Sequence, residues 1–128
     1  MHIKRLAQAA LYKAPNHFEM SALRLQGFES AGPKSAWVGL SYFLPGGGAG
    51  PDSSALEKTY IVLAGSVTVR ASGQEVTLGP LDSCYIPPNE EREVRNLSNE
   101  VASMLVVMVS IGVFGPRTNG RSLEEITD

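Results

Sequence analysis

Short runs of alternating hydrophobic and polar residues, separated by turn residues, extend from residue 18 to residue 110. The run EKTYIVLA at 57–64 is rich in β-branched and aromatic residues, and SVTVRA at 66–71 follows it directly after Gly65. Other β-like runs are FEMSALRL, SAWVGLSYFL, EVTL, SCYI, REVRN and VASMLVVMV, and turn signals such as PGGGAGPDSS at 45–54 and SGQ at 72–74 separate them. Many short strands without a helical period between them predict an all-β fold, an antiparallel sandwich or barrel.

The two ends of the chain differ from this pattern. The apolar residues before Pro15 fit one face of a helix, and they fit an extended arm equally well, so we assign 1–17 as an N-terminal arm or short helix. Residues 115–128 are polar and glycine-punctuated, and Ser122 and Glu125 have the spacing of a capping box for one short turn. We therefore expect a C-terminal tail without a catalytic role. No internal repeat or linker appears, which predicts one domain over 1–128.

Composition and charge narrow the classes of function. The chain has 128 residues, 43% of them hydrophobic, and a formal charge of −2 with scattered lysines and arginines, so nucleic acid is not an expected partner. The longest apolar stretch, at 101–114, is shorter than the roughly 20 residues that span a bilayer, so we expect no membrane association. The N-terminus does not read as a signal peptide and the single Cys84 can form no intramolecular disulfide, which favours a cytoplasmic location.

The glycines and polar residues from 46 to 65 follow a spaced motif. Gly46, Asp52, Ser54, Lys58 and Gly65 stand at the offsets of Gly, five residues, His-x-His, three residues, Glu, six residues, Gly. Only glycine tolerates a positive φ without strain, so such glycines suit the tight corners of a small barrel.

A second spaced motif follows at residues 81–96. Its pattern is Gly, five residues, Pro-x-Gly, two residues, His, three residues, Asn, and the chain has Leu81, Pro87, Asn89, Arg92 and Asn96 at those offsets. With both motifs present, the chain resembles a small single-domain cupin over about residues 36–110. The resemblance implies a jelly-roll barrel, also called a double-stranded β-helix, and a homodimer, because cupins of this size usually pair. An apolar segment before Pro15 agrees with pairing.

The metal-ligand positions of the motifs have been replaced. Metal-binding cupins use three histidines and one glutamate that point into the barrel, and the matching positions here hold Asp52, Ser54, Lys58 and Arg92. An ammonium and a guanidinium would repel a divalent cation, so we expect no metal and no cofactor. His17 is the one reservation, because it could fold over the barrel mouth; such a histidine is more often hydrogen-bonded locally.

The replaced positions predict a different chemistry. Lys58 and Tyr60 share one face of their strand, and the motif register puts that face and Arg92 inside the barrel. Two buried cations require a counter-charge, either from protein carboxylates such as Asp52 and Glu57 or from a ligand. We therefore predict a metal-independent barrel that binds a small carboxylate or oxyacid. The assigned binding residues are Arg92, Tyr60, Ser54, Asp52 and His17.

Lys58 is the candidate catalytic residue, because burial beside Arg92 favours a neutral amine that could abstract a proton or form an imine. Four interpretations remain open. The barrel could be a cofactor-free lyase, isomerase or decarboxylase, a binding module without chemistry, a metal-dependent enzyme with atypical ligands including His17, or an inherited shape with an internally paired interior. Cys84 is interpreted as a small buried hydrophobe.

Overall fold

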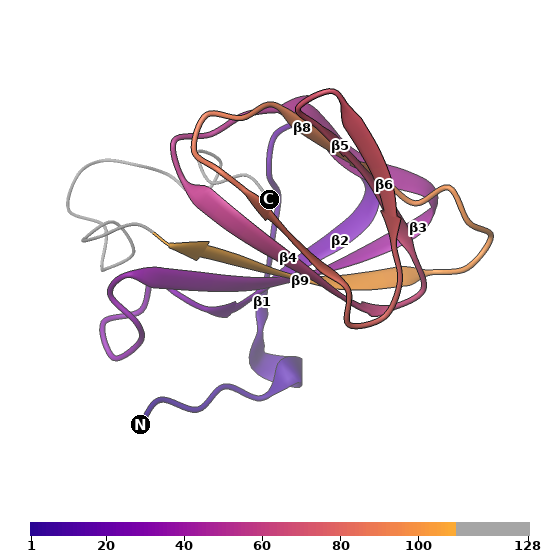
Figure 1. Ribbon diagram of the computed structural model, residues 1–128. Helices are drawn as coiled ribbons and strands as arrows, with labels where there is room; N and C mark the ends of the chain where they lie inside the picture. The colour runs from indigo at the N-terminus through magenta and orange to yellow at the C-terminus, as the bar shows by residue number, and fades with distance from the viewer. Residues whose placement is uncertain (110–128) are drawn as a thin grey trace.

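The computed structural model describes residues 1–109, and it is built almost entirely of strands (Figure 1). Its elements are the 3-10 turn η1 (Leu6–Gln8) and the strands β1 (Ala10–Tyr12), β2 (His17–Gln26), β3 (Ala36–Asp52), β4 (Glu57–Ala64), β5 (Val67–Ala71), β6 (Gln74–Leu78), β7 (Ser83–Ile86), β8 (Arg92–Arg95) and β9 (Ala102–Val109). The capping box expected at Ser122 and Glu125 lies outside the described residues. Within 1–109, no helix is long and apolar enough to cross a membrane.

The strands form a nearly closed antiparallel barrel, which confirms the predicted all-β fold. Their order is β6-β5-β8-β3-β9-β4-β7, and β2 pairs with both β1 and β3. Figure 1 shows β5, β6 and β8 on one side of the barrel and β4, β9 and the start of β3 on the other. The described strand order ends at β6 and β7, so the barrel wall has a seam between these two strands.

β3 is longer than the sequence predicted. The expected turn at 45–54 is wrong, because β3 continues through the glycine-rich segment to Asp52. Its first part pairs with β9 and its last part with β8, so this single strand joins the two sides of the barrel. A Cβ atom on Gly48 would lie 2.3 Å from the carbonyl oxygen of Val94 on β8. The glycines therefore permit close approach of two backbones within a strand, rather than a turn.

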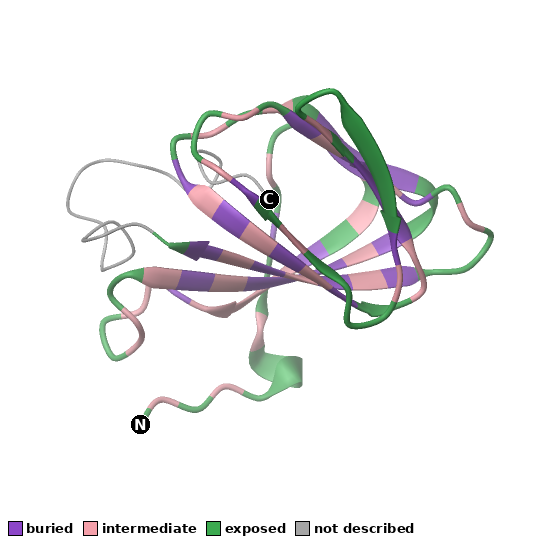
Figure 2. Ribbon diagram, viewed as in Figure 1, coloured by how far each residue is buried: buried purple, intermediate pink, exposed green. Residues whose placement is uncertain are grey.

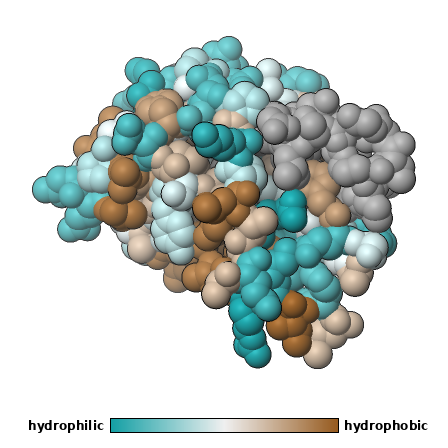
Figure 3. Space-filling model, turned by 180° about the vertical axis from the view of Figure 1, so that it is seen from behind, coloured by the Kyte–Doolittle hydropathy of each residue, from teal (hydrophilic) through white to brown (hydrophobic). Residues whose placement is uncertain are grey.

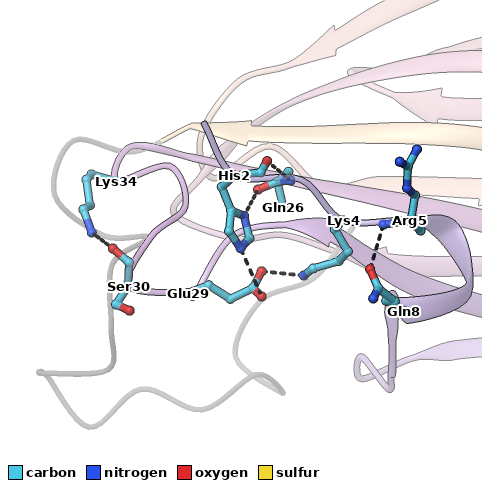
Figure 4. Close-up of polar contacts among 8 residues, drawn as sticks. All are labelled: His2, Lys4, Arg5, Gln8, Gln26, Glu29, Ser30 and Lys34. Carbon is cyan, nitrogen blue, oxygen red and sulfur yellow. Dashed lines mark hydrogen bonds and ion pairs between the residues drawn. The ribbon is translucent and has the colours of Figure 1, made fainter.

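The N-terminal segment is an extended arm with one 3-10 turn, η1, and not a helix of several turns. Polar side chains fix this arm to the end of β2 and the loop that follows it (Figure 4). His2 Nδ1 lies 3.1 Å from Oε1 of Gln26, and Lys4 forms an ion pair with Glu29. The side chain of Lys4 is only 10% exposed, so its charge lies against the protein rather than in solvent.

Alternation along the strands separates the core from the surface, as the purple and pink bands in Figure 2 show. On β4 the side chains of Lys58, Tyr60 and Val62 are buried, whereas Thr59 and Ile61 are only partly buried. The inner faces supply the core residues Tyr12, Ala22, Trp37, Phe43, Ala49, Val67, Val69, Ile86, Val94, Met104, Val106 and Met108. Burial of this apolar surface supplies most of the driving force for folding. Lys58 is thus a charged residue at a core position.

Both motif segments keep the backbone geometry for which glycine is suited. Gly46 and Gly65 have φ of 83° and 73°, and a Cβ on Gly65 would lie 2.8 Å from the carbonyl oxygen of Val101. Leu81 and Asn89 stand where the second motif has glycine, and their φ values are also positive, at 67° and 66°. At these two positions the chain therefore has the backbone conformation of the motif glycine although the residue is not glycine.

Candidate functional site

Three polar side chains are buried in the barrel interior. Lys58 and Tyr60 lie on the inner face of β4, and Arg92 lies at the start of β8 on the opposite side of the barrel. Their exposed fractions are 2%, 0% and 2%. Charged side chains are rarely buried to this extent unless they are paired. The inward orientation expected from the motif register agrees with these burials.

Arg92 is the most unusual of these groups. Its Nε atom donates a 3.0 Å hydrogen bond to the hydroxyl oxygen of Tyr60. Both terminal nitrogens of the guanidinium are buried, and neither has a hydrogen-bond partner among the residues that the structure describes. A buried cationic donor without partners is costly, so this guanidinium is suited to receive an anion.

Lys58 is oriented by the loop between β3 and β4. Its Nζ atom donates a hydrogen bond to Oγ of Ser54, and the same oxygen lies 3.3 Å from the backbone nitrogen of Leu56. The carbonyl oxygen of Ser54 accepts a 2.7 Å hydrogen bond from the backbone N–H of Asn89. The two motif segments are therefore connected through Ser54, and the ammonium of Lys58 is held at the level of that connection.

Of the two carboxylates considered as counter-charges, Asp52 is the β3–β8 register partner of Arg92, and Glu57 begins β4. Asp52 is partly buried, and its Oδ1 accepts a 2.8 Å hydrogen bond from the backbone N–H of Ser53. Glu57 accepts a 2.6 Å hydrogen bond from the hydroxyl of Tyr85, in an exposed contact. Within residues 1–109, no carboxylate forms an ion pair with Arg92. The geometry gives no support to an interior in which protein carboxylates neutralise Arg92.

His17 forms a local contact, with Nδ1 2.7 Å from the carbonyl oxygen of Pro15. Its backbone pairs with Ala49 of β3, beside the barrel wall. Across the described range, no group of three or more histidine, cysteine or acidic side chains could hold a metal ion. The four motif positions supply one carboxylate, one hydroxyl and two cations, which is a poor donor set for a divalent metal. The interior therefore does not fit the metal that metal-binding cupins hold.

Two hollows lie near these residues. A hollow of about 530 Å³ is lined by Arg92 and Ala71 together with Arg70, Glu75 and Glu93 among others. Arg92 is buried whereas Arg70 is exposed, so this hollow extends from the surface of the wall to Arg92. A second hollow of about 110 Å³ lies at the seam between β6 and β7 and includes Cys84 and Ile86 of the inner face.

Sequence reasoning missed the position of Cys84. It was expected to be a buried hydrophobe, and it is partly buried at the seam, opposite Tyr60 in the β4–β7 register. Burial raises the pKa of the Cys84 thiol above its ordinary value, which keeps it neutral near pH 7. The signal for this position is the alternation on SCYI, which puts Cys84 and Ile86 on one face.

Comparison with known proteins agrees with the fold and the motifs. Residues 39–108 match the family described as Cupin domain. A curated relative from Mycobacterium tuberculosis, named Beta-D-galactosidase Rv1717, is 41% identical over 108 residues, which cover 84% of this chain and 93% of that protein.

Two solved structures show the same fold at low sequence identity. The polyketide cyclase RemF from Streptomyces resistomycificus has a TM-score of 0.75 at 19% identity, over 98% of this chain and 89% of its own. A Cupin 2 conserved barrel domain protein from Salinispora arenicola has a TM-score of 0.70 at 22% identity, over 86% of this chain and 89% of its own. Since the family match spans more than half of the residues and the two motifs occupy their expected turns, this chain belongs to the cupin domain family.

Proposed function

We propose that the barrel interior binds a small carboxylate or related oxyacid without a metal ion. The observation that carries this proposal is the buried guanidinium of Arg92, whose two terminal nitrogens have no partner within residues 1–109. A carboxylate matches the planar, two-pronged geometry of a guanidinium and forms short charge-assisted hydrogen bonds with it. An anionic ligand would therefore satisfy the donors that the protein leaves open.

The neighbouring residues have complementary tasks in this proposal. Tyr60 fixes the orientation of the guanidinium through Nε, which leaves the terminal nitrogens to face the ligand. Lys58 adds a second positive charge, held by Ser54. Lys58 in its neutral amine form is the group that would accept a proton from the bound acid, whereas its protonated form supplies the second positive charge. Asp52 is the β3–β8 register partner of Arg92 and His17 pairs with Ala49 of β3, and neither forms one of these two contacts.

Calorimetric titration with acetate and pyruvate tests the binding. Two charge-assisted hydrogen bonds contribute about 1.5–3 kcal/mol each, so Arg92→Met should weaken binding about 100-fold or more. Arg95→Met is the matched control, because Arg95 lies on the same strand, is 38% exposed and forms its ion pair with Glu93. Equal affinities for wild type and Arg92→Met would contradict the proposal, as would absence of binding by any small acid.

Catalysis is tested separately from binding. Lys58→Met should abolish any proton exchange at the methyl carbon of bound pyruvate, measured by NMR in deuterated water, because it removes the base that would take a proton from the carbon next to the ketone. Retention of exchange in Lys58→Met would exclude Lys58 as the base. Absence of exchange in the wild type, with binding intact, favours a binding module.

The relative named Beta-D-galactosidase Rv1717 favours a second candidate, hydrolysis of a glycoside in the same barrel. Most glycosidases use two carboxylates about 5–10 Å apart that flank the scissile bond. Asp52 is the one acidic residue at the four replaced motif positions, and Glu57 contacts Tyr85 in an exposed position. Hydrolysis of a nitrophenyl β-D-galactoside that is lost in Asp52→Asn would support this candidate, and no hydrolysis at all would remove it.

A further inference from the structure

The hollow at the seam adjoins the proposed anion site through residues of two strands, β5 and β7. Each of the three site residues has a cross-strand neighbour in its lining: Ala71 pairs with Arg92, Cys84 with Tyr60, and Ile86 with Lys58. Cross-strand neighbours lie on the same face of a sheet with Cβ atoms about 4.5–5.5 Å apart. The hollow is therefore a lateral extension of the interior site.

The inner lining of this hollow is apolar. Val69 and Ala71 come from β5, Val76 from β6, and Cys84 and Ile86 from β7. The thiol of Cys84 is neutral near pH 7 because its pKa is raised by burial, so it adds no charge. The volume of about 110 Å³ is smaller than the about 150 Å³ of a cavity that holds benzene, which suits a short alkyl chain.

The outer rim of the hollow carries one negative charge. Oγ of Ser72, in the turn between β5 and β6, donates a 2.5 Å hydrogen bond to Oε1 of Glu90 before β8. Both residues line the hollow, and their contact connects the two sides of the seam at its outer end. A ligand with a second carboxylate at this end would meet the charge of Glu90, which disfavours dicarboxylates.

We infer that the seam between β6 and β7 is a chain-binding subsite, which selects monocarboxylic acids with a short apolar chain over dicarboxylates and polyhydroxylated acids. The inference rests on the proposed carboxylate site. The head group lies at Arg92 and the chain extends past Ala71 and Cys84 towards the seam. Since each buried methylene favours binding by about 0.8 kcal/mol, the chain rather than the head group determines which acid is preferred.

The experiment is calorimetric titration of four probes: acetate, pentanoate, hexanoate and glutarate, the last a dicarboxylate of the same length as pentanoate. Wild-type protein should bind pentanoate roughly tenfold or more tightly than acetate, and glutarate more weakly than pentanoate. Cys84→Leu fills the hollow, so it should weaken the binding of pentanoate about tenfold and leave the affinity for acetate unchanged. Ser83→Leu adds the same bulk on the exposed face of β7 and should change neither.

Cys84→Ala provides the opposite change, and it keeps the test informative should Cys84→Leu fail to fold. Because this substitution enlarges the hollow, it should raise the affinity for hexanoate relative to that for pentanoate. If none of the acids binds to wild type, the proposed carboxylate site itself is wrong. If acetate and pentanoate bind equally, or Cys84→Leu weakens both to the same extent, the carboxylate site remains and the chain subsite is rejected.

Discussion

Arg92 on β8 and Tyr60 on β4 are joined across the barrel interior by a 3.0 Å hydrogen bond from Nε to the phenol oxygen. Both side chains are almost completely buried, and the bond satisfies one of the nitrogen atoms of the guanidinium. The other two remain without partners within the described residues. A site that is prepared for an anion is therefore expected to lower the stability of the ligand-free protein.

The first prediction concerns this cost. Arg92→Met should leave the free energy of unfolding unchanged or raise it by about 1 kcal/mol, because an apolar side chain of similar length replaces an incompletely paired buried charge. Tyr60→Phe should lower it by about 1–3 kcal/mol, because it removes the acceptor for Nε and leaves the charge in place. Urea denaturation measures both.

The double variant Arg92→Met/Tyr60→Phe is the control for coupling. With the guanidinium absent, the hydroxyl of Tyr60 has less to stabilise. The free energy of unfolding of the double variant should therefore be closer to that of Arg92→Met than the sum of the two single effects predicts. A large loss of stability in Arg92→Met alone would mean that the guanidinium is well paired, and would contradict the interpretation of its terminal nitrogens.

A second prediction follows from the backbone at Leu81. This residue has a φ of 67° and is 78% exposed, so its side chain gains little from packing while its backbone is in the left-handed region. That conformation costs a residue other than glycine roughly 1–2 kcal/mol, and glycine loses some of this gain through unfolded-state entropy. Leu81→Gly should raise the free energy of unfolding by about 0.5–1 kcal/mol, measured by thermal and urea denaturation.

Leu97→Gly is the matched control, since Leu97 is similarly exposed at 71% and is not among the residues with positive φ. It should be neutral or destabilising. Equal effects of the two substitutions would show that removal of an exposed leucine, and not relief of the turn, is responsible.

Leu81 also illustrates what the sequence allows. The motif offsets placed a glycine turn at this position although the residue is leucine, and the same offsets put Lys58 and Arg92 at inward positions. Strand alternation located most of the strands, because one face of each is buried and the other is not. These features depend on local pattern and could be predicted.

Three features could not be predicted from local pattern. Glycine runs have a low strand propensity, so the second part of β3 was expected to be a turn; its glycines reflect contact with β8, which exists only after folding. The subsite at Cys84 depends on the described strand order ending at β6 and β7, which is a property of the whole barrel. The position of Asp52 is the third feature: it is the register partner of Arg92 just after an irregularity in the β3–β8 pairing, and within residues 1–109 it forms no ion pair with Arg92.

The third prediction concerns the arm and pH. The hydrogen bond from Lys4 holds the pKa of Glu29 below its ordinary value of 4.5. Burial opposes this effect, and the nearby charges of Lys4, His2 and Arg24 add to it. A lowered folded-state pKa stabilises the contact above the ordinary value, and this contribution is lost as pH falls through the lowered pKa. Amide protection of residues 3–8, followed by NMR, should therefore decrease below about pH 4.

Lys4→Met should reduce the protection of the arm already at pH 7, because the ion pair of Glu29 is lost. Lys34→Met is the control, since Lys34 donates to the carbonyl oxygen of Ser30 in an exposed contact and forms no ion pair within residues 1–109. The two residues lie on separate segments around the same loop (Figure 4). Protection that is the same in both variants would mean that Lys4 does not hold the arm.

The arm has an unusual distribution of side chains, which leads to the fourth prediction. Lys4 is 10% exposed, whereas Ile3, Leu6 and Leu11 are 60%, 55% and 72% exposed. In Figure 3, hydrophobic surface is visible on the protruding lower part of the molecule, where the arm lies. β1 pairs only with β2 within the described strands, so its other edge has no strand beside it. Exposed apolar side chains next to an open strand edge are typical of an interface.

We propose that a second copy of the chain covers this arm, so that the protein is a homodimer. A two-fold arrangement would place β1 and Leu11 of each copy against the same surface of the other, which closes the open edge. Leu11→Asp should then shift the molar mass from dimer to monomer in light scattering at micromolar concentration, because a charge would be buried at the interface. Leu97→Asp introduces the same charge at an equally exposed leucine in the loop before β9, and should leave the dimer intact. A monomeric wild type would reject the proposal, and a dimer that persists in Leu11→Asp would place the interface on another face.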